Sequence, residues 1–447
     1  MFRRLLVANR GEVAARILRT TKRLGVESVA VCSKADRDLS YLRHADEVVE
    51  IGGARAYLDI DAIIEAAEST RCSAVHPGWG FLAENPTFAA RCEAARITFV
   101  GPRPRSMREM ADKARARDTM TALGLDPVPG TGVLKSPEAA RKATAMMGPP
   151  VLLKALAGGG GRGMRRVFSI DDAASAFAEA SAEAVAAFSD GRMYMEKLIV
   201  RGRHIEFQVL GDGRGDVRVL GARECSVQRR HQKLIEETPA PGLTAELLAD
   251  TTRRVHEVCA ALRYRGAGTV EMLMDVDSGE LWFMEMNTRL QVEHTVTEAV
   301  TGIDLVEWQL RVAANQGLSD FPQIASAGHA IECRINAEDV SAGFRPTPGT
   351  IHRLSLPGAL AGVRVDTHLS EGDHISPHYD SMFAKLIAHG QDRDEARSRM
   401  AAALDALIVE GVPTTAGLHR TIIDHPDFAS GRYDTRFLER ELEGMLA

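Results

Sequence analysis

The sequence lacks an apolar run long enough to cross a membrane. Its N-terminus, MFRRLLVANRGE, has only four consecutive apolar residues, whereas a membrane span needs about 20 and a signal peptide needs a longer apolar core. A basic excess is also missing, because the formal net charge is −6 and nucleic-acid-binding proteins usually present a basic surface. We therefore expect neither a membrane nor a nucleic acid as a partner.

Cysteine pairs with metal-ligand or redox spacing are also absent. The six cysteines contain no CxxC motif and are scattered along the chain: Cys32, Cys72, Cys92, Cys225, Cys259 and Cys333. Six cysteines could form three disulfides, but a long, glycine-rich chain without such spacing is more typical of a cytoplasmic protein with reduced, buried thiols. The composition, 45% hydrophobic and 26% charged, is that of a soluble globular protein.

The N-terminal part of the chain alternates short apolar runs with helical patterns. The segments are LLVA, GEVAARILRTTKRLG, SVAVCS, DIDAIIEAAEST, SAVH and ITFVG. Strands that alternate with helices predict a parallel sheet with crossover helices, and so a doubly wound α/β domain over residues 1–110. Ser106 and Glu109 have the spacing of a capping box and predict one helix that ends at Gly124.

From Pro127 onward the pattern changes to an α+β mixture. Strands are predicted in VLLKAL, RRVFS, MYMEKLIV, HIEFQVLGD, DVRVLGARECS, GTVEMLMDV and ELWFMEMN, and a long helix in DDAASAFAEASAEAVAAF. The turn residues between the strands favour antiparallel pairing. A last segment from about Ala325 carries HAIECRINAED and a helix around DEARSRMAAALDAL. Because no low-complexity linker separates these parts, we expect the domains to pack closely.

The segment KALAGGGGRGMRR begins at Lys154 and contains the glycine pattern Gly158-x-Gly160-x-x-Gly163 of dinucleotide-binding folds. That pattern requires a following helix and an acid about 20 residues on, at the end of a second strand. Here MRRVFS is typical of a returning strand, and Glu183 lies in a predicted helix. Strand, glycine loop and strand form a hairpin whose backbone N–H groups can approach phosphates. A surface hairpin without a ligand is the alternative, and dinucleotide binding is the least favoured interpretation.

Two acidic residues interrupt otherwise apolar strands near the DSG turn. Glu271 and Glu285 each lie seven residues from Ser278, so a loop centred on Ser278 places them opposite each other. Burying an unpaired carboxylate is costly, and cross-strand neighbours about 5 Å apart can share a hard cation. Asn287 points to the same face as Glu285. These oxygen ligands suit Mg²⁺ bound to nucleotide phosphates. The alternative is that both acids face solvent on one side of the sheet.

Two further clusters of polar residues could bind an anion. In TRLQVEH, alternating Arg289, Gln291 and Glu293 point one way if the backbone is extended, and could hold and deprotonate a small oxyanion. The segment QRRHQK gathers cations in an acidic protein, namely Arg229, Arg230, His231 and Lys233. A solvated polar face is the alternative for both clusters.

Taken together, the motifs resemble those of the biotin carboxylase family, the ATP-grasp component of biotin-dependent carboxylases such as acetyl-CoA carboxylase. They are LLVANRGEVAARI, HPGWGFLAEN, GGGGRGM, MEK, RHIEFQVLGD, QRRHQK, YRGAGTVE, EMNTRLQVEH, ECRINAED and YDSMFAKLI, and they span about 380 residues. The resemblance implies a doubly wound N-terminal domain (1–110), an ATP-grasp domain (111–324) with a mobile glycine-rich lid (about 128–200), and a biotin carboxylase C-terminal domain (325–447).

The resemblance also implies a two-step reaction and a role for each matching residue. ATP phosphorylates bicarbonate to carboxyphosphate, and the CO₂ that this releases carboxylates biotin. The expected ATP contacts are Lys113, Lys154, Gly160, Gly161, Glu196, Lys197, Ile199, His204 and His231. The expected ligands of two Mg²⁺ ions, or of Mn²⁺ in their place, are Glu271, Glu285 and Asn287. Bicarbonate would contact Lys233, Arg289, Gln291 and the Val292 N–H, with Glu293 as its base and Arg334 as the residue that stabilises the biotin enolate.

A few positions depart from the familiar pattern of the family. Leu156 and Ala157 stand where a serine and a glycine are common, Trp79 stands for a frequent tyrosine, and Thr295 stands for a proline. We expect these residues to alter lid kinetics and fine substrate preference rather than the reaction.

The sequence contains no AMKM-like biotin-acceptor motif. We therefore expect biotin to arrive on a separate biotin carboxyl carrier protein, or the chain to be one domain of a larger protein. Carboxyltransferase subunits and a second copy of the chain are the other expected partners. The final acceptor, among acetyl-CoA, propionyl-CoA, pyruvate or urea, is chosen by the carboxyltransferase.

Three other functions fit the sequence less well. An ATP-grasp ligase that joins a carboxylate to an amine would share Lys154, Glu271 and Glu285, but has no reason to carry HPGWGFLAEN, QRRHQK and ECRINAED together. A non-catalytic assembly subunit has no need of intact Lys233 and Glu293. A dinucleotide-dependent oxidoreductase depends on the glycine pattern alone.

Overall fold

The computed structural model describes residues 1–157 and 163–446. Its N-terminal region contains β1 (Arg4–Val7), α1 (Gly11–Leu24), β2 (Glu27–Ser33), β3 (Glu47–Gly52), α2 (Ile60–Ser69), β4 (Ala74–His76), α3 (Pro86–Ala94) and β5 (Thr98–Phe99). The strands form a five-stranded sheet in the order β3-β2-β1-β4-β5, and all neighbours are parallel. Alternate residues of β1 enter different hydrophobic cores, Leu5 on the side of α1 and Leu6 on the side of α2 and α3. Both faces are therefore covered, as the predicted doubly wound domain requires.

The prediction of a single helix that starts at the Ser106–Glu109 capping box is wrong. Two helices occupy this segment, α4 (Pro104–Ala111) and α5 (Lys113–Ala122), and Ser106 lies inside α4. Asp112 between them has an extended backbone, with ψ of 105°, and its carboxylate accepts the N–H groups of Ala114 and Arg115. The helix is interrupted at Asp112 because an aspartate cap satisfies the free N–H groups at the start of a new helix.

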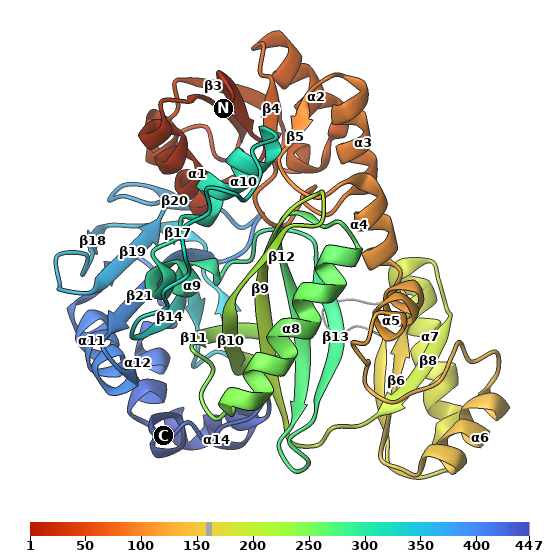
Figure 1. Ribbon diagram of the computed structural model, residues 1–447. Coiled ribbons are helices and arrows are strands. Elements are labelled where there is room, and N and C mark those ends of the chain that lie inside the picture. The colour runs from red at the N-terminus through yellow and green to blue at the C-terminus, as the bar shows by residue number, and fades with distance from the viewer. Residues whose placement is uncertain (158–162, 447) are drawn as a thin grey trace.

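An antiparallel sheet of eight strands forms the centre of the molecule (Figure 1). Its strands are β9 (Gly202–Asp212), β10 (Val217–Arg229), β11 (Gln232–Thr238), β12 (Arg265–Asp275), β13 (Leu281–Asn287), β14 (His329–Asn336), β19 (Val363–Thr367) and β21 (Met382–Gly390). They lie in the order β13-β12-β9-β10-β11-β14-β21-β19. Because β11 pairs with β14, the sheet runs without interruption across the predicted domain boundary near residue 325.

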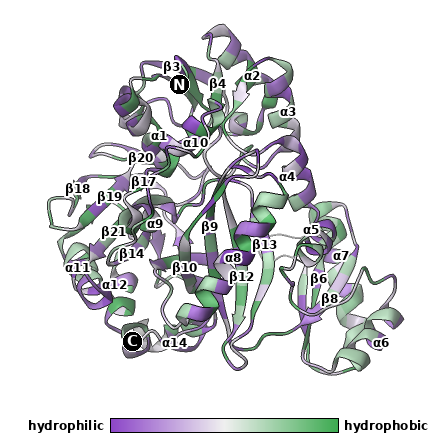
Figure 2. Cartoon of the chain, in the orientation of Figure 1, coloured by the Kyte–Doolittle hydropathy of each residue, from purple (hydrophilic) through white to green (hydrophobic). Residues whose placement is uncertain are grey.

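The other elements pack around this sheet or extend from it. The helices are α8 (Ala245–Ala261), α9 (His294–Thr301), α10 (Leu305–Ala313), α11 (Arg393–Ala406), α12 (Ala416–Asp424), α13 (Pro426–Ala429) and α14 (Phe437–Leu446). The short strands form separate two-stranded sheets, β15 with β16, β17 with β20 and β18 with β22. Their bounds are β15 (Glu338–Asp339), β16 (Arg345–Pro346), β17 (Gly349–Thr350), β18 (Arg353–Ser355), β20 (His374–Ile375) and β22 (Ile408–Glu410). Figure 2 shows central strands such as β12 coloured largely hydrophobic, while outer helices such as α11 alternate between hydrophobic and hydrophilic residues. This alternation is typical of helices that bury one face.

The segment 128–200 is called the lid region, and its described residues form a separate small layer beside the central sheet (Figure 1). It contains α6 (Pro137–Met147), β6 (Val151–Ala155), β7 (Met164–Val167), α7 (Ala173–Phe188) and β8 (Met193–Lys197). The strands pair antiparallel in the order β7-β6-β8. Their buried side chains form a hydrophobic cluster of their own, so this region packs as its own unit.

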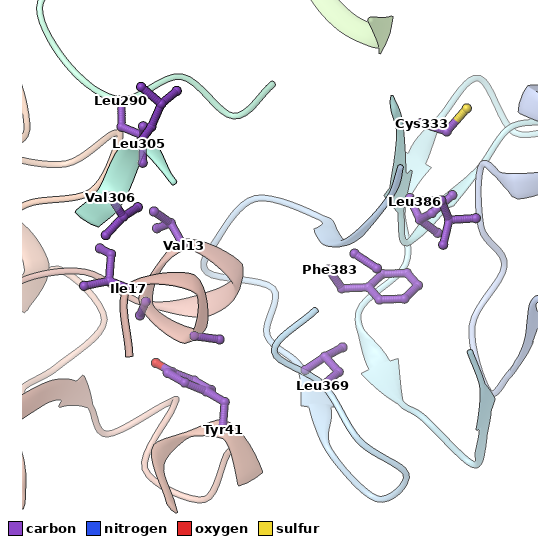
Figure 3. Packing of buried hydrophobic residues seen from close by; sticks show 14 of the residues in the cluster. Val13, Ile17, Tyr41, Leu290, Leu305, Val306, Cys333, Leu369, Phe383 and Leu386 are labelled. Carbon is purple, nitrogen blue, oxygen red and sulfur yellow. The ribbon is translucent and has the colours of Figure 1, made fainter. Parts of the chain in front are cut away.

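The largest hydrophobic cluster joins the N-terminal and C-terminal parts of the chain. Figure 3 shows Val13 and Ile17 of α1 beside Leu305 and Val306 of α10, with Phe383 of β21 on another side. All six cysteines are buried and free, as predicted. Within the described residues, no helix combines the length and the apolar character that crossing a membrane requires.

His76, the last residue of β4, is fully buried, and its ring Nδ1 accepts the N–H of Gly78 at 3.0 Å. Burial lowers the pKa of His76 to about 3. In the unfolded chain the pKa is about 6.5, so the unfolded state takes up a proton first as the pH falls. Stability is therefore lost as the pH drops below 6.5 towards 3.

His76→Asn keeps an acceptor for the Gly78 N–H but does not titrate in this range. We expect the unfolding free energy of the wild type, minus that of the variant, to decrease by about 2 kcal/mol between about pH 7.5 and pH 5. Urea denaturation of both proteins at the two pH values measures this difference. A difference that does not change with pH would contradict a buried, neutral ring.

Candidate active site

A cavity of about 650 Å³ lies between the central sheet, the lid region and the start of the C-terminal region. Its lining includes most of the residues singled out from the sequence: Lys113, Lys154, Glu196, Lys197, Ile199, His204, His231, Lys233, Glu271, Glu285, Asn287, Arg289, Gln291, Val292 and Arg334. Trp79 lines it as well. Gly160 and Gly161 lie outside the described residues. The fold therefore brings together, in one cavity, groups that are spread over more than half of the sequence.

Lys233 is the centre of the charge network at the floor of the cavity. Its Nζ donates to Glu206 at 2.6 Å, to Glu271 at 2.9 Å and to Glu293 at 2.7 Å. Burial would raise the pKa of Glu293, but Lys233 and Arg334 together hold it well below its usual range. Glu293 is fully buried and ionised, so it is able to accept a proton.

Arg334 approaches Glu293 from β14. Its guanidinium donates to Glu236 at 2.6 Å and to Glu293 at 3.0 Å. Glu236 has a different environment, because burial outweighs the effect of Arg334 and raises its pKa to about 7. Two buried glutamates thus share one arginine, and Glu293 is the one held firmly as a carboxylate.

The expected opposition of Glu271 and Glu285 is confirmed by the register of β12 and β13, but its cause differs from the prediction. Met274 pairs with Leu281, so the hairpin is centred between residues 277 and 278 rather than on Ser278. A bulge between the Met272–Phe283 and Glu271–Glu285 pairs restores the opposition. Such a bulge inserts one extra residue into a strand and redirects its side chains.

The two opposed carboxylates have different surroundings. Glu271 is buried and contacts His204 at 3.1 Å and Gln291 at 3.0 Å, in addition to Lys233. The Glu285 side chain is 44% exposed, and Lys113 Nζ lies 3.9 Å away. Asn287, two residues further along β13, accepts from Arg289 at 3.2 Å. The set of carboxylate and amide oxygens facing the cavity is of the kind that Mg²⁺ prefers.

The lid region contributes a second group of charges. Lys154 on β6 donates to Glu196 on β8 at 2.9 Å, and Arg117 of α5 also bonds Glu196. Burial tends to lower the pKa of Lys154, but Glu196 and Tyr194 more than compensate and raise it. Lys154 is therefore a fixed positive charge at the cavity wall, as phosphate binding requires.

The segment Arg289–Glu293 is not extended, so the predicted alternation along a strand is wrong. Val292 and Glu293 lie in a turn that leads into α9, and Glu293 is the residue before its first turn, with ψ of 11°. The side chains nevertheless converge, since Arg289 donates to Gln291 at 2.7 Å and Gln291 donates to Glu271 at 3.0 Å. The turn therefore brings the polar side chains of this segment together, as an extended strand was expected to do.

The residues that flank the glycine run form the expected hairpin. Lys154 pairs with Met164 across the antiparallel β6–β7 ladder, and the helix α7 begins only after β7. Gly163 has a φ of +69°, and a Cβ there would lie 2.7 Å from Ala155 Cβ. A strand rather than a helix follows the loop, which excludes the arrangement of a dinucleotide fingerprint.

Three network residues were missed in the sequence, namely Glu206, Arg223 and Glu236. Glu271, Glu206 and Arg223 are cross-strand neighbours on β12, β9 and β10, and Arg223 donates to Glu206 at 2.5 Å. A signal was present, because each is a charged residue within a segment that was predicted to be, or proved to be, a strand with mostly buried residues. A charge in the middle of an apolar strand indicates a buried partner.

The central sheet, the lid region and the charged cavity between them define an enzyme of the ATP-grasp class. Residues 112–321 match the family model of the carbamoyl-phosphate synthase L chain, ATP binding domain. Residues 1–107 match the biotin carboxylase N-terminal domain, and residues 332–440 match the biotin carboxylase C-terminal domain. The chain belongs to the biotin carboxylase family.

Similar proteins cover the chain almost end to end. The biotin carboxylase of Pseudomonas aeruginosa is 47% identical, with 99% of each chain covered. The biotin carboxylase of Campylobacter jejuni, solved as a β-γ-ATP complex, is 45% identical, with a TM-score of 0.94 and coverage of 98% of this chain and 99% of that chain. The biotin carboxylase domain dimer of Hydrogenobacter thermophilus 2-oxoglutarate carboxylase, in complex with MgADP and bicarbonate, is 44% identical, with a TM-score of 0.95 and coverage of 100% and 99%. The expected three-part fold is thereby confirmed.

Proposed function

We propose that the protein carboxylates biotin at the expense of ATP, with bicarbonate activated as carboxyphosphate. The observation that supports this most directly is the buried, ionised Glu293 between Lys233 and Arg334. Lys233 and Arg334 line the cavity, and both contact the buried Glu293 carboxylate. Two cations that share a carboxylate form a site that can bind a small oxyanion and accept its proton. Membership of the biotin carboxylase family supports biotin as the second substrate.

The residues present fit Mg-ATP, which supplies the phosphoryl group when bound and whose metal neutralises its charge. Glu271, Glu285 and Asn287 would hold the metal. The nucleotide would contact Lys113, Lys154, Glu196, Lys197, Ile199, His204 and His231, together with Gly160 and Gly161 of the glycine loop. The lid region, by covering the cavity, would keep water from carboxyphosphate.

Bicarbonate would be held by Arg289, Gln291, Lys233 and the Val292 N–H, beside Glu293. As Lys233 and Arg334 turn from Glu293 towards bound anions, the carboxylate loses the cations that lower its pKa, and it becomes a stronger base. Glu293 then takes the bicarbonate proton, and the oxyanion is positioned for attack. Arg334 would afterwards stabilise the enolate of biotin as a planar donor.

One assay tests the reaction as a whole. ATP hydrolysis in the presence of Mg²⁺ is measured with and without bicarbonate and free biotin. We expect hydrolysis to depend on bicarbonate, and ¹⁴C from bicarbonate to appear in biotin. A rate of ATP hydrolysis that does not depend on bicarbonate would refute the proposed function. Binding of NADH instead of ATP would favour an oxidoreductase.

The metal assignment predicts a specific effect of Glu285→Gln. We expect the Mg²⁺ concentration for half-maximal activity to rise by at least about tenfold, because even the loss of a group that only supports a metal ligand typically costs 10- to 100-fold in metal affinity. Glu285 is preferable to Glu271 for this test, because Glu271 also pairs with Lys233 and His204. Glu280→Gln, an exposed neighbour, serves as the control. An unchanged Mg²⁺ dependence in the Glu285 variant would refute the assignment.

The biotin assignment predicts that Arg334→Ser separates the two half-reactions. We expect carboxylation of free biotin to fall by about 100-fold, since one lost donor to a developing oxyanion costs about that much. Bicarbonate-dependent ATP hydrolysis should fall less, because the proposed bicarbonate contacts Lys233, Arg289 and Gln291 remain in the cavity. Both rates are measured on the same preparation, and equal losses would leave the biotin role without support.

The partners follow from the same proposal. Biotin would be presented by a biotin carboxyl carrier protein, and its carboxyl group would pass to an acceptor on carboxyltransferase subunits. A second copy of the chain is a further proposed partner, supported by the dimer of the Hydrogenobacter relative. We also propose the functional divisions 1–110, 111–324 and 325–447, with the lid region acting as the mobile cover. Purification of the protein with its partners from its source would identify the acyl acceptor.

A further inference from the structure

Lys385 on β21 is fully buried below the segment predicted to bind bicarbonate. Its Nζ donates to the Val292 carbonyl oxygen at 2.6 Å, and lies 3.3 Å from Glu12 and 4.0 Å from Glu332. A buried ammonium group is costly unless it is paired and hydrogen-bonded. Glu12 belongs to α1 and Glu332 to β14, so Lys385 contacts three separate parts of the chain at once.

The shortest of these contacts is the one to the backbone. Burial raises the pKa of Glu12 and raises that of Glu332 to about 8. Glu332 also has a second partner, the Thr295 hydroxyl, which donates to it. Both acids are therefore less strongly ionised than an ordinary glutamate, and the Val292 carbonyl is the nearest acceptor of Lys385.

The segment Gln291–Glu293 is held at each of its residues. The Gln291 carbonyl accepts from His294 Nδ1 at 2.7 Å, and burial keeps that ring neutral by lowering its pKa well below the usual value. The Val292 carbonyl accepts from Lys385, and the Glu293 carboxylate accepts from Arg334 at 3.0 Å.

Lys385 and Arg334 act from the same face of the sheet. They are cross-strand partners on β21 and β14, so their side chains project side by side. Arg334 reaches the side chain of Glu293, while Lys385 reaches the carbonyl of the preceding residue. In Figure 3, Leu386 and Cys333, the residues next to Lys385 and Glu332, lie close to each other in the hydrophobic core. The charged side chains are thus fixed by strands that are themselves well packed.

We propose that Lys385 is a positioning residue for the anion-binding segment Gln291–Glu293. By fixing the Val292 carbonyl, it fixes the planar peptide unit that joins Val292 to Glu293, and so sets the position from which the Glu293 carboxylate extends. Lys385 is not among the residues that line the cavity, so it acts through the segment and does not contact bicarbonate or ATP. This inference rests on the proposed function, because it assigns bicarbonate to that segment.

Lys385→Met tests the role by removing Nζ while keeping an unbranched apolar side chain. We expect the KM for bicarbonate to rise roughly tenfold, since small displacements of positioned groups cost rates of this order or more. The KM for ATP should change by less than about twofold, because Lys385 itself contacts none of the proposed ATP-binding residues that the structure describes and its effect reaches them only through other side chains. Lys385→Gln retains a donor for the Val292 carbonyl, and its rise in the KM for bicarbonate should be smaller.

The matched control is Glu332→Gln, which removes a carboxylate from the same cluster but leaves the bond from Lys385 to Val292. Its KM for bicarbonate should stay within about twofold of the wild type, because the Val292 carbonyl keeps its donor Lys385 and the anion-binding segment stays in position. Equal rises in Lys385→Met and Glu332→Gln would overturn the proposal, as would a lower melting temperature with an unchanged KM. Insolubility of both Lys385 variants would also overturn it, because the lysine would then serve folding alone. A wild type without bicarbonate dependence would instead refute the proposed function.

Discussion

Replacing Glu293 with glutamine is expected to lower kcat for bicarbonate-dependent ATP hydrolysis by about 10²- to 10⁴-fold, the contribution typical of a positioned general base. The amide has nearly the same size but cannot accept the bicarbonate proton. It also leaves Lys233 and Arg334 without the carboxylate that they share. Steady-state hydrolysis, measured at saturating ATP and varied bicarbonate, gives kcat and KM separately.

Glu236→Gln provides the matched control for this prediction. Glu236 is also buried and also accepts from Arg334, but its pKa is raised to about 7, so it is partly protonated near neutral pH and resembles glutamine already. We expect a much smaller loss of kcat. If the two variants lost the same activity, the effect would come from charge beside Arg334 and not from proton transfer by Glu293.

The largest loss of stability is expected for Arg223→Met. Arg223 is fully buried, and it donates to Glu206 at 2.5 Å, to Gln208 at 2.7 Å and to Thr297 at 2.9 Å. Its removal leaves these acceptors unsatisfied and Glu206 with Lys233 as its remaining cation. We expect the free energy of unfolding to fall by about 3–5 kcal/mol, as when one partner of a buried ion pair is lost. Urea denaturation followed by circular dichroism measures it.

Arg253→Met is the control for Arg223. Arg253 pairs with Asp250 and Glu257 on the exposed surface of α8, where ion pairs contribute little. Its unfolding midpoint should match that of the wild type. A similar midpoint in the Arg223 variant would show that the buried pair does not stabilise the fold.

The order of elements was largely predictable from the sequence because local patterns determine it. Alternating strands and helices predicted the doubly wound region, and short strands with turns predicted the antiparallel sheet. The broken helix at Asp112 shows the limit of this approach. A capping box at Ser106 and an aspartate cap at Asp112 compete for the same segment, and the sequence pattern alone does not state which one wins.

The site was predictable where its residues lie close together in the sequence. Glu271, Glu285 and Asn287 belong to one hairpin, and Arg289, Gln291 and Glu293 to the segment that follows. Their detailed geometry was not predictable, since a bulge sets the register and a turn replaces the expected strand. Glu206 and Arg223 could not be connected to Lys233 from local patterns, because those contacts depend on which strands become neighbours.

The pairing of β11 with β14 has a practical consequence for work with parts of the protein. A fragment ending near residue 324 would keep β11 but lose its neighbour, leaving an edge of unpaired N–H and C=O groups in the middle of what was a sheet. Such an edge recruits other chains. The isolated ATP-binding portion is therefore expected to aggregate when produced alone, and experiments on nucleotide binding should use the full-length chain.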